Sequence, residues 1–211
     1  RQMCIRDSYK GLFSSFNSMN MFEIVHSLLR QFGPENWTLY KGKHLLSFVD
    51  NHDVSRIASN LTNEKHLPLI YAMMFGMPGI PCVYYGSEWG AKANKSEGDP
   101  ALRVSFDAPV YNDLSAFITK LAEAKKNSEA LNYGSFRSVV LTNRQYAYAR
   151  IKDQDAIVVA ANNDENPADM SIPVPVDGTY ENAFTKEAVP VVDGRLQVHL
   201  DACESKVFRK K

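Results

Sequence analysis

The chain has 211 residues, of which 45% are hydrophobic and 11% aromatic, and its 24 basic residues balance its 24 acidic ones. This length fits one large domain or two small ones, with enough apolar side chains for a substantial core. A net charge of zero provides no single-sign field for nucleic acid or an anionic membrane surface. No apolar stretch approaches the ~18 residues that cross a bilayer. We therefore predict neither a nucleic-acid partner nor a membrane partner.

The cysteines are three in number and widely spaced, at Cys4, Cys82 and Cys203. They form neither a disulfide framework nor a metal-binding motif, and the histidines are scattered without metal-ligand spacing, so we predict no metal site. Cys82 lies in an apolar run and is predicted to be a small buried side chain. This cysteine usage favours a reducing, cytoplasmic compartment, and the sequence leaves localisation otherwise open.

The first part of the chain alternates between helical and strand patterns. Residues 1–8 start with Arg and show no period that continues into the chain, so we interpret them as not native and leave them out of the fold. Apolar residues at intervals of three and four predict an amphipathic helix over 18–32. A buried strand is predicted over 44–50. A helix that is apolar most of the way round follows over 64–76, and a second short buried strand over 80–86.

The later part of the chain changes from a helical to a strand period. A loop rich in Gly, Lys, Asn, Asp and Pro spans 86–112, which is long for a compact domain and indicates function or disorder. Asp113 is predicted to cap a helix over 114–127. From Phe136 onward, short runs of Val, Ile and Tyr alternate with turn signals, which is typical of an all-β sandwich.

The order of these elements predicts two domains. Two strands with interposed helices fit a parallel α/β sheet, but two strands complete neither a barrel nor a core. We therefore predict that residues 1–132 are the C-terminal portion of a larger α/β domain and that residues 133–211 are a β-sandwich domain.

The stretch FVDNHD, at residues 48–53, carries the clearest functional signal. A predicted buried strand is followed by the amide of Asn51, the imidazole of His52 and the carboxylate of Asp53. This order is expected where the carboxyl end of a parallel strand lies at an active site for a polar small molecule. For an isolated NHD motif, a helix-capping Asp and a structural His would be the favoured interpretation, because motif matches are often false positives.

Two further stretches reverse that preference: GIPCVYYGSEWG at 79–90 and GDPALR at 98–103. With FVDNHD, extended by VSR, they resemble the α-amylase family of glycoside hydrolases over roughly residues 9–211, in the same order. The bacterial maltodextrin- and cyclomaltodextrin-degrading members are the most similar in style. The resemblance implies the seventh and eighth strands of a TIM (β/α)8 barrel, followed by a C-terminal β-sandwich.

The resemblance also implies roles for individual residues. Asp53 would stabilise the transition state by holding sugar hydroxyls, without acting as nucleophile, and His52 would donate to a neighbouring hydroxyl. Asn51 would orient Asp53 or contact substrate, and a purely structural loop amide is equally consistent with the sequence. Glu88 and Trp89 would flank the sugar, because aromatic faces suit the apolar faces of glucose.

Three other residues near these motifs, Arg56, Tyr84 and Tyr85, are interpreted as structural, and Asp50 is not expected to serve as a catalytic carboxylate. Arg56 is expected to be a solvated or ion-paired side chain on a helix. Tyr84 and Tyr85 should point to opposite faces of a strand and serve packing. Asp50 is three residues from Asp53 on the same motif and lacks an appropriate partner for catalysis.

The catalytic carboxylates of a retaining glycosidase are a nucleophile and an acid/base about 5 Å apart. In the α-amylase family they lie in a GFRxD-like motif and after the fifth strand, and neither motif occurs here. We therefore predict a fragment of a retaining glycosidase that hydrolyses α-1,4-glucosidic bonds in α-glucans or maltodextrins, with the fragment alone inactive. The alternatives are a non-catalytic carbohydrate-binding or scaffold relative, and a transglycosylase. Calcium dependence and oligomeric state stay open.

Overall fold

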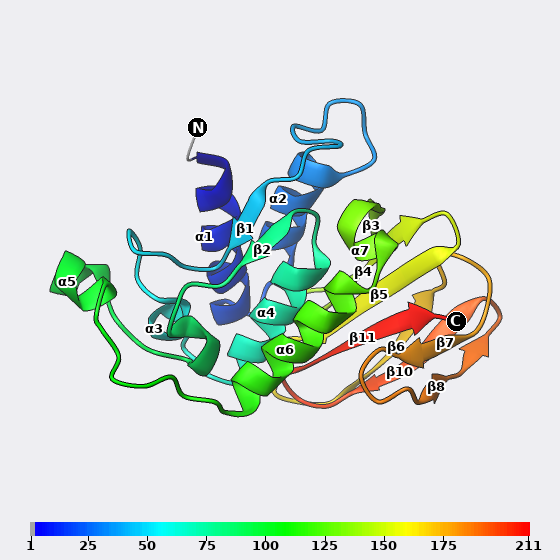
Figure 1. Ribbon diagram of the computed structural model, residues 1–211. Coiled ribbons are helices and arrows are strands. Elements are labelled where there is room, and N and C mark those ends of the chain that lie inside the picture. Colours follow the sequence, from blue (N-terminus) through cyan, green and yellow to red (C-terminus); the bar gives the residue numbers. More distant parts are fainter. Residues whose placement is uncertain (1–2) are drawn as a thin grey trace.

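The structure of the chain is a computed structural model that describes residues 3–211, with side chains described from residue 9 onward. Helices and two short strands make up the first part, and the second part is all strand (Figure 1). The first part comprises α1 Met3–Asn17, α2 Phe22–Phe32, β1 Leu46–Phe48, α3 Ile57–Asn60, α4 His66–Gly76, β2 Ile80–Cys82, η1 Ser87–Trp89, η2 Lys95–Glu97, α5 Asp99–Leu102, α6 Asp113–Lys126 and α7 Glu129–Tyr133. The second part comprises β3 Ser135–Leu141, β4 Gln145–Lys152, β5 Asp155–Asn162, β6 Ala168–Pro173, β7 Tyr180–Asn182, β8 Ala188–Val189, β9 Val191–Val192, β10 Arg195–Leu200 and β11 Glu204–Lys210.

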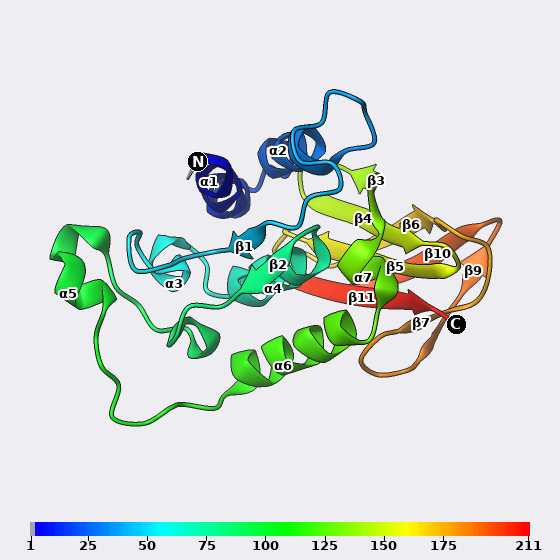
Figure 2. The same cartoon turned by 45° about the horizontal axis from the view of Figure 1, so that its top comes forward.

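The α/β part is centred on a parallel pair of strands. β1 pairs with β2 in the register Leu46↔Ile80 to Phe48↔Cys82. The helices α1 and α2 lie on one side of this pair and α6 on the other, with α4 leading into β2 (Figure 2). The two strands are shorter than the sequence predicts, because the backbone leaves the sheet after Phe48 and Cys82 to form the loops of the candidate site. This is a partial α/β region built on parallel strands, as predicted.

Several element boundaries differ from the prediction. The helix α1 was not expected; its Leu12 and Phe16 are fully buried, and its backbone includes residues 3–8, which the sequence pattern left out of the fold. Arg1 and Gln2 lie outside the described residues, as does the side chain of Cys4. The cap of α6 is Asn112, whose side chain accepts from the backbone N–H of Ser115, and not Asp113.

Cys82 is exposed, so the prediction of a buried side chain was wrong. It lies on β2, which among the described residues is hydrogen-bonded to β1 alone, and Ile80 on the same strand is also exposed. A strand at the edge of a two-stranded sheet leaves apolar side chains uncovered that a wider sheet would bury. The predicted loop over 86–112 contains η1, η2 and α5 and is not structureless.

The β part is a sandwich of a six-stranded sheet, β3-β4-β5-β11-β7-β8, and a three-stranded sheet, β6-β10-β9. Side chains alternate along β5: Ile157 and Val159 pack into a core with the helices, whereas Val158 and Ala160 pack against the three-stranded sheet. The six-stranded sheet is thus covered on both faces, which explains why β5 reads as a continuous apolar run.

The two parts of the chain share one apolar core. Tyr148 of β4 donates a hydrogen bond to the carbonyl of Met73 in α4 (2.9 Å), and Arg150 donates to the carbonyl of Gly76 (3.0 Å). The largest buried cluster runs from Leu12 in α1 to Val207 in β11. The boundary between residues 132 and 133 stays a prediction, because packing continues across it.

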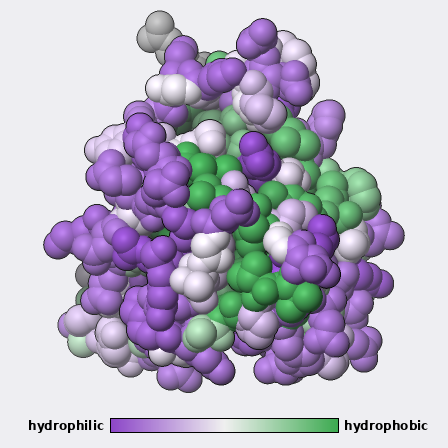
Figure 3. Space-filling view, turned by 90° about the vertical axis from the view of Figure 1, so that its right-hand side faces the viewer, coloured by the Kyte–Doolittle hydropathy of each residue, from purple (hydrophilic) through white to green (hydrophobic). Residues whose placement is uncertain are grey.

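The outer side of the sandwich carries apolar residues within a mainly polar surface (Figure 3). The edge strand β9 contributes exposed apolar side chains, with Val191 37% and Val192 52% exposed. Proline at residue 190 and glycine at residue 194 bracket this strand and keep it short, which limits its use as a template for pairing with another chain.

Candidate active site

The candidate site lies where β1 and β2 end. Parallel strands present their carboxyl ends at the same edge of a sheet, so the loops after Phe48 and Cys82 emerge side by side. The side chain of Asp53 is 54% exposed at this edge, and that of His52 is 53% exposed. The site is therefore open to a polar ligand from solvent.

Asp53 is held by its own loop. The side-chain oxygen of Asn51 accepts a hydrogen bond from the backbone N–H of Asp53 at 2.7 Å, which is the geometry of an Asx turn. The imidazole Nε2 of His52 lies 3.5 Å from Oδ2 of Asp53. Asn51 thus positions the backbone of Asp53, while His52 sits beside its carboxylate.

Arg103 reaches the same carboxylate from the loop after β2. Its guanidinium lies 3.5 Å from Oδ1 of Asp53 and 3.1 Å from Oδ2 of Asp99, one turn back in sequence. Asp99 also pairs with Lys95, and that hydrogen bond lowers the pKa of Asp99 below its ordinary value, with Arg103 acting in the same direction. The result is a row of alternating charges, solvent-exposed but linked, that ends at Asp53.

Tyr84 forms the wall next to His52. The two rings are 6.5 Å apart, and the Tyr84 hydroxyl donates to the carbonyl of Leu102 at 3.0 Å. Tyr84 and Tyr85 do not point to opposite faces as predicted, because β2 ends at Cys82 and the strand alternation no longer applies. Their rings meet edge to face at 4.7 Å.

Beneath this surface lies a buried polar layer built on Asp50. Its Oδ2 accepts hydrogen bonds from the backbone N–H of Ile57 (2.8 Å) and from the Ser87 hydroxyl (2.7 Å). Burial raises the pKa of Asp50, outweighing these two hydrogen bonds and the nearby charge of Arg56. Asp50 is thus a structural group of the two loops.

Arg56 completes the buried layer. It is fully buried, so the expectation of a solvated helix-surface arginine was wrong. Its guanidinium donates to the carbonyl of Tyr85 (2.8 Å) and to the Ser87 hydroxyl (3.0 Å), and it lies 4.7 Å from the ring centre of Tyr84. Cation–π contact and carbonyl acceptors replace the water that the guanidinium loses on burial.

Glu88 and Trp89 lie on η1 and face other neighbours than Asp53. The charge of Glu88 raises the pKa of Asp50. The Oε2 atom of Glu88 is buried and has no hydrogen-bond partner among the described residues. The Trp89 ring packs edge to face on Phe106 at 5.1 Å and lines a cavity of about 230 Å³ with Leu67 and other residues. The structure therefore groups Asn51, His52 and Asp53 together and places Glu88 and Trp89 in separate surroundings.

The sequence analysis predicts no role at this site for Arg103 or Tyr84. Arg103 is the last residue of GDPALR, and its spacing of four from Asp99 is a signal for an ion pair on a helical turn. Within residues 9–211, no cluster of three or more His, Cys, Asp or Glu side chains could hold a metal ion. In the same part of the chain, no helix is long and apolar enough to cross a membrane.

The fold and this site define an α/β catalytic region with a C-terminal β-sandwich. The profile of the alpha-amylase catalytic domain matches residues 10–164, and that of the alpha-amylase C-terminal all-beta domain matches residues 140–205. The chain belongs to the α-amylase family of glycoside hydrolases, whose members act in carbohydrate metabolism.

Individual relatives agree with this assignment. A cyclomaltodextrin glucanotransferase of Bacillus sp. (strain 6.6.3) is 30% identical over 153 residues, which cover 72% of this chain and 20% of that protein. The α-amylase of Anoxybacillus superposes with a TM-score of 0.83 at 20% identity over 96% of this chain and 45% of that one. The α-amylase of Geobacillus thermoleovorans, solved with acarbose, gives 0.83 at 17% identity over 99% of this chain and 47% of that one. The chain thus spans about a fifth of the first relative's length and just under half of these solved structures.

Proposed function

We propose that this chain is the part of a retaining α-glucan hydrolase that binds the hydroxyl groups of the sugar next to the bond that is cleaved. The reaction is cleavage of α-1,4-glucosidic bonds in maltodextrins, and the nucleophile and the acid/base carboxylate come from residues outside this sequence. On this proposal the 211-residue chain alone has no hydrolytic activity. The observation that carries the proposal is the half-exposed carboxylate of Asp53, held between His52 and Arg103 at the end of a barrel strand.

The chemistry of the site suits this role. A carboxylate accepts hydrogen bonds from two sugar hydroxyls, and charge-assisted bonds of this kind are about twice as strong as neutral ones. His52 and Arg103 supply donors on either side, so a hydroxyl oxygen can be bound as acceptor while its hydrogen goes to Asp53. Hydrogen bonds that shorten as the ring distorts toward an oxocarbenium ion lower the barrier without covalent chemistry by Asp53.

The remaining predicted residues take secondary roles. Asn51 positions Asp53 through its backbone N–H. Tyr84, next to His52, offers an aromatic face to the sugar ring. Glu88 and Trp89 lie in other surroundings than Asp53, so a contact of either residue with the sugar stays a prediction.

The test is the substitution Asp53→Asn in the full-length enzyme, with maltooligosaccharide as substrate. We expect kcat to fall about 100-fold or more with a smaller change in KM, because the lost contact strengthens in the transition state. The matched control is Asp107→Asn, which removes an exposed carboxylate from the loop that follows β2. If Asp53→Asn turned over the substrate as fast as the control, the role proposed for Asp53 would be wrong.

Transglycosylation is the second candidate, because one of the relatives is a glucanotransferase. The same residues would hold the donor sugar, and the difference would lie in whether water or a sugar hydroxyl attacks. Product analysis of the full-length enzyme with an added labelled acceptor separates the two reactions. A full-length protein that binds maltodextrin but forms neither product would instead support the non-catalytic relative.

A further inference from the structure

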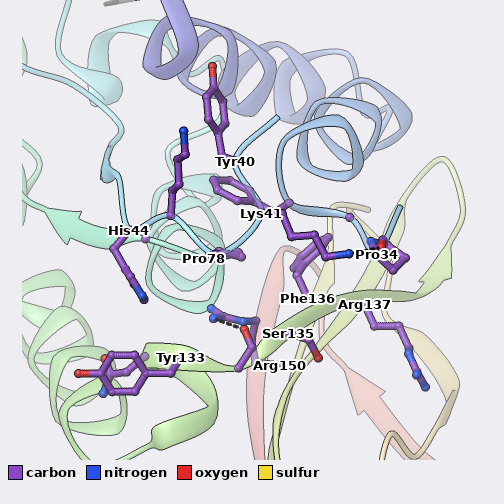
Figure 4. Close-up of a pocket in the computed structure, with 17 residues that line it drawn as sticks. Pro34, Tyr40, Lys41, His44, Pro78, Tyr133, Ser135, Phe136, Arg137 and Arg150 are labelled. Atoms are coloured by element: carbon purple, nitrogen blue, oxygen red, sulfur yellow. Dashed lines mark hydrogen bonds between the residues drawn. The ribbon is translucent and has the colours of Figure 1, made fainter. Parts of the chain in front are cut away.

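A second cavity lies at the opposite end of the parallel strands from Asp53. It has a volume of about 330 Å³ and is lined by the loop after α2, by residues just before β1 and β2, and by β3 and β4 (Figure 4). His44 precedes β1 and Gly79 precedes β2, so this cavity, here called the basal cleft, faces the amino ends of the strands. One wall comes from the α/β part and the other from the sandwich.

The lining of the basal cleft is cationic. Its 17 residues include Lys41, Lys43, His44, Arg137 and Arg150, and none of the 17 is Asp or Glu. Not all of these charges face the cleft: Lys41 donates to the carbonyl of Pro34, and Arg137 extends away from the other labelled side chains in Figure 4. The remaining basic side chains of the lining are Arg150, which is buried behind the inner wall, and Lys43 and His44, which are exposed at the mouth.

Arg150 is the unusual member of this set. It is only 1% exposed, and its two terminal nitrogens donate to the carbonyls of Gly76 (3.0 Å) and Gly134 (2.8 Å). Its Nε has no hydrogen-bond partner among the residues that the structure describes. Both acceptors are neutral. Enclosing a guanidinium without a carboxylate costs free energy that hydrogen bonds to carbonyls only partly offset.

A second buried cation lies close to Arg150. Lys125 of α6 donates to the carbonyls of Phe75 (3.3 Å) and Leu131 (3.0 Å). Burial, together with the smaller effect of the nearby Arg150 charge, lowers its pKa to about 7. Lys125 lines an adjoining cavity that shares His44, Gly79, Asn132 and Tyr133 with the basal cleft. Among the described residues both side chains have carbonyl partners, so Arg150, and Lys125 when it is protonated, create a positive potential at this end of the sheet.

The basal cleft also has an aromatic side. The Tyr133 ring is 63% exposed and meets the His44 ring at 5.5 Å. An aromatic surface beside cations suits a ligand with an anionic end and a ring that can lie on the aromatic face. The cavity volume is at the lower end of the range for small-molecule sites, about 300–1,000 Å³.

We propose that the basal cleft binds a phosphate group, either as inorganic phosphate or as the phosphate ester of a sugar, with Arg150 at its inner wall and Lys43 and His44 at its mouth. The phosphate supplies the negative charge that the buried guanidinium lacks, and a sugar, where present, lies on Tyr133. The site is separate from the Asp53 site and recognises charge, whereas the Asp53 site recognises hydroxyl groups.

The test is calorimetric titration of the 211-residue protein at constant ionic strength with inorganic phosphate, glucose 1-phosphate and glucose. The proposal expects saturable binding of both phosphates and no binding of glucose at the same concentrations. The double variant Lys43→Gln/His44→Gln, at exposed positions, should bind phosphate roughly fivefold or more weakly. The control is Lys10→Gln, an exposed lysine on α1 outside the cleft, which should bind as the unchanged protein does.

Comparing the titrations with inorganic phosphate and with glucose 1-phosphate identifies the ligand. Tighter binding of glucose 1-phosphate indicates a sugar phosphate, and equal binding indicates that the phosphate alone is recognised. The Nε–H NMR signal of Arg150, assigned through the backbone signals of the same residue, should shift on addition of phosphate, which reports on the inner wall without a variant that disturbs the core. Absence of saturable phosphate binding, glucose binding equal to that of its phosphate, or a double variant that matches Lys10→Gln would each overturn the proposal.

Discussion

Oδ2 of Asp50 lies 2.7 Å from the hydroxyl of Ser87, so one buried hydrogen bond joins the loop after β1 to the loop after β2. The same oxygen also caps the backbone N–H of Ile57, the first residue of α3. The buried carboxylate of Asp50 therefore holds both loops that form the candidate site. Asp53 lies three residues further along the chain, at the surface above Asp50.

The first prediction concerns Asp50→Asn and the dependence of stability on pH. Burial raises the pKa of Asp50 above its ordinary value of 3.8. Between that value and the folded-state pKa the folded chain binds more protons than the unfolded chain, so the free energy of unfolding falls as pH rises through this window. Asparagine keeps an oxygen acceptor but does not titrate, so this decrease should be absent in Asp50→Asn.

Urea unfolding of both proteins between pH 3.5 and pH 7 measures the difference. All other carboxylates are common to the two chains, so their contributions cancel when one curve is subtracted from the other. Two parallel curves would show that burial of Asp50 does not govern its titration.

The second prediction concerns Gly76, the last residue of α4. A methyl group there would overlap the Tyr148 hydroxyl and lie 2.7 Å from Cγ2 of Val159, both on the six-stranded sheet. Gly76→Ala should therefore lower the free energy of unfolding by about 1–3 kcal/mol, through overpacking at the junction of the two parts.

The matched control for that prediction is Gly11→Ala within α1. A methyl group at residue 11 meets its nearest neighbour, Ile24, at an ordinary 3.6 Å. Alanine is the better helix former, so this change should be neutral or stabilise by up to ~1 kcal/mol. Thermal or chemical unfolding measures both variants, and equal effects of the two substitutions would contradict close packing at Gly76.

The third prediction uses Lys125, whose pKa falls to about 7 in the folded protein from an ordinary 10.5, mainly through burial. Between these two values the unfolded chain binds more protons than the folded chain, so the free energy of unfolding should rise with pH from about 7 toward 10. Lys125→Met should flatten this rise.

The absolute stability of Lys125→Met also falls, because the carbonyls of Phe75 and Leu131 lose a donor, so the slope against pH is the informative quantity. Lys126→Met at the neighbouring exposed position is the control and should keep the slope. If both variants lose it equally, the titrating group is not Lys125.

The fourth prediction is that residues 1–132, expressed alone, are insoluble or molten. The main core combines Met73 and Phe75 of α4 with Tyr148, Val159 and Val207 of the six-stranded sheet, so removing residues 133–211 exposes one side of α4. The test compares dye binding to exposed apolar surface and the dispersion of NMR signals with those of the 211-residue chain. A cooperative melt with dispersed signals for residues 1–132 would contradict this prediction.

The sequence predicts those elements whose apolar pattern reflects the local structure. The all-round apolar run of α4 and the three-four spacing of α6 locate both helices to within two residues, and the change to short alternating runs after Phe136 locates the sandwich. The NHD motif predicts where polar side chains gather because strand ends are fixed by the sheet. These features depend on residues near in sequence.

The sequence does not predict features set by distant partners. Arg56 is buried because Tyr84, Tyr85 and the carbonyl of Leu102, at least 28 residues away, surround its guanidinium. The surroundings of Arg103 and Glu88 are likewise determined by how the two loops after the strands meet. The basal cleft was not predicted either, because its cations come from both parts of the chain and share no sequence pattern.

The position of α4 between the strand pair and the six-stranded sheet has a consequence for sequence variation. Ten of its 11 residues are buried, and the exception is the partly buried Pro68. Most surface helices accept polar replacements along one side, but on α4 a charged replacement meets apolar neighbours at almost every position. Homologous sequences should therefore show their narrowest range of side chains in this helix, and a sandwich exchanged between homologues should retain function only when α4 is exchanged with it.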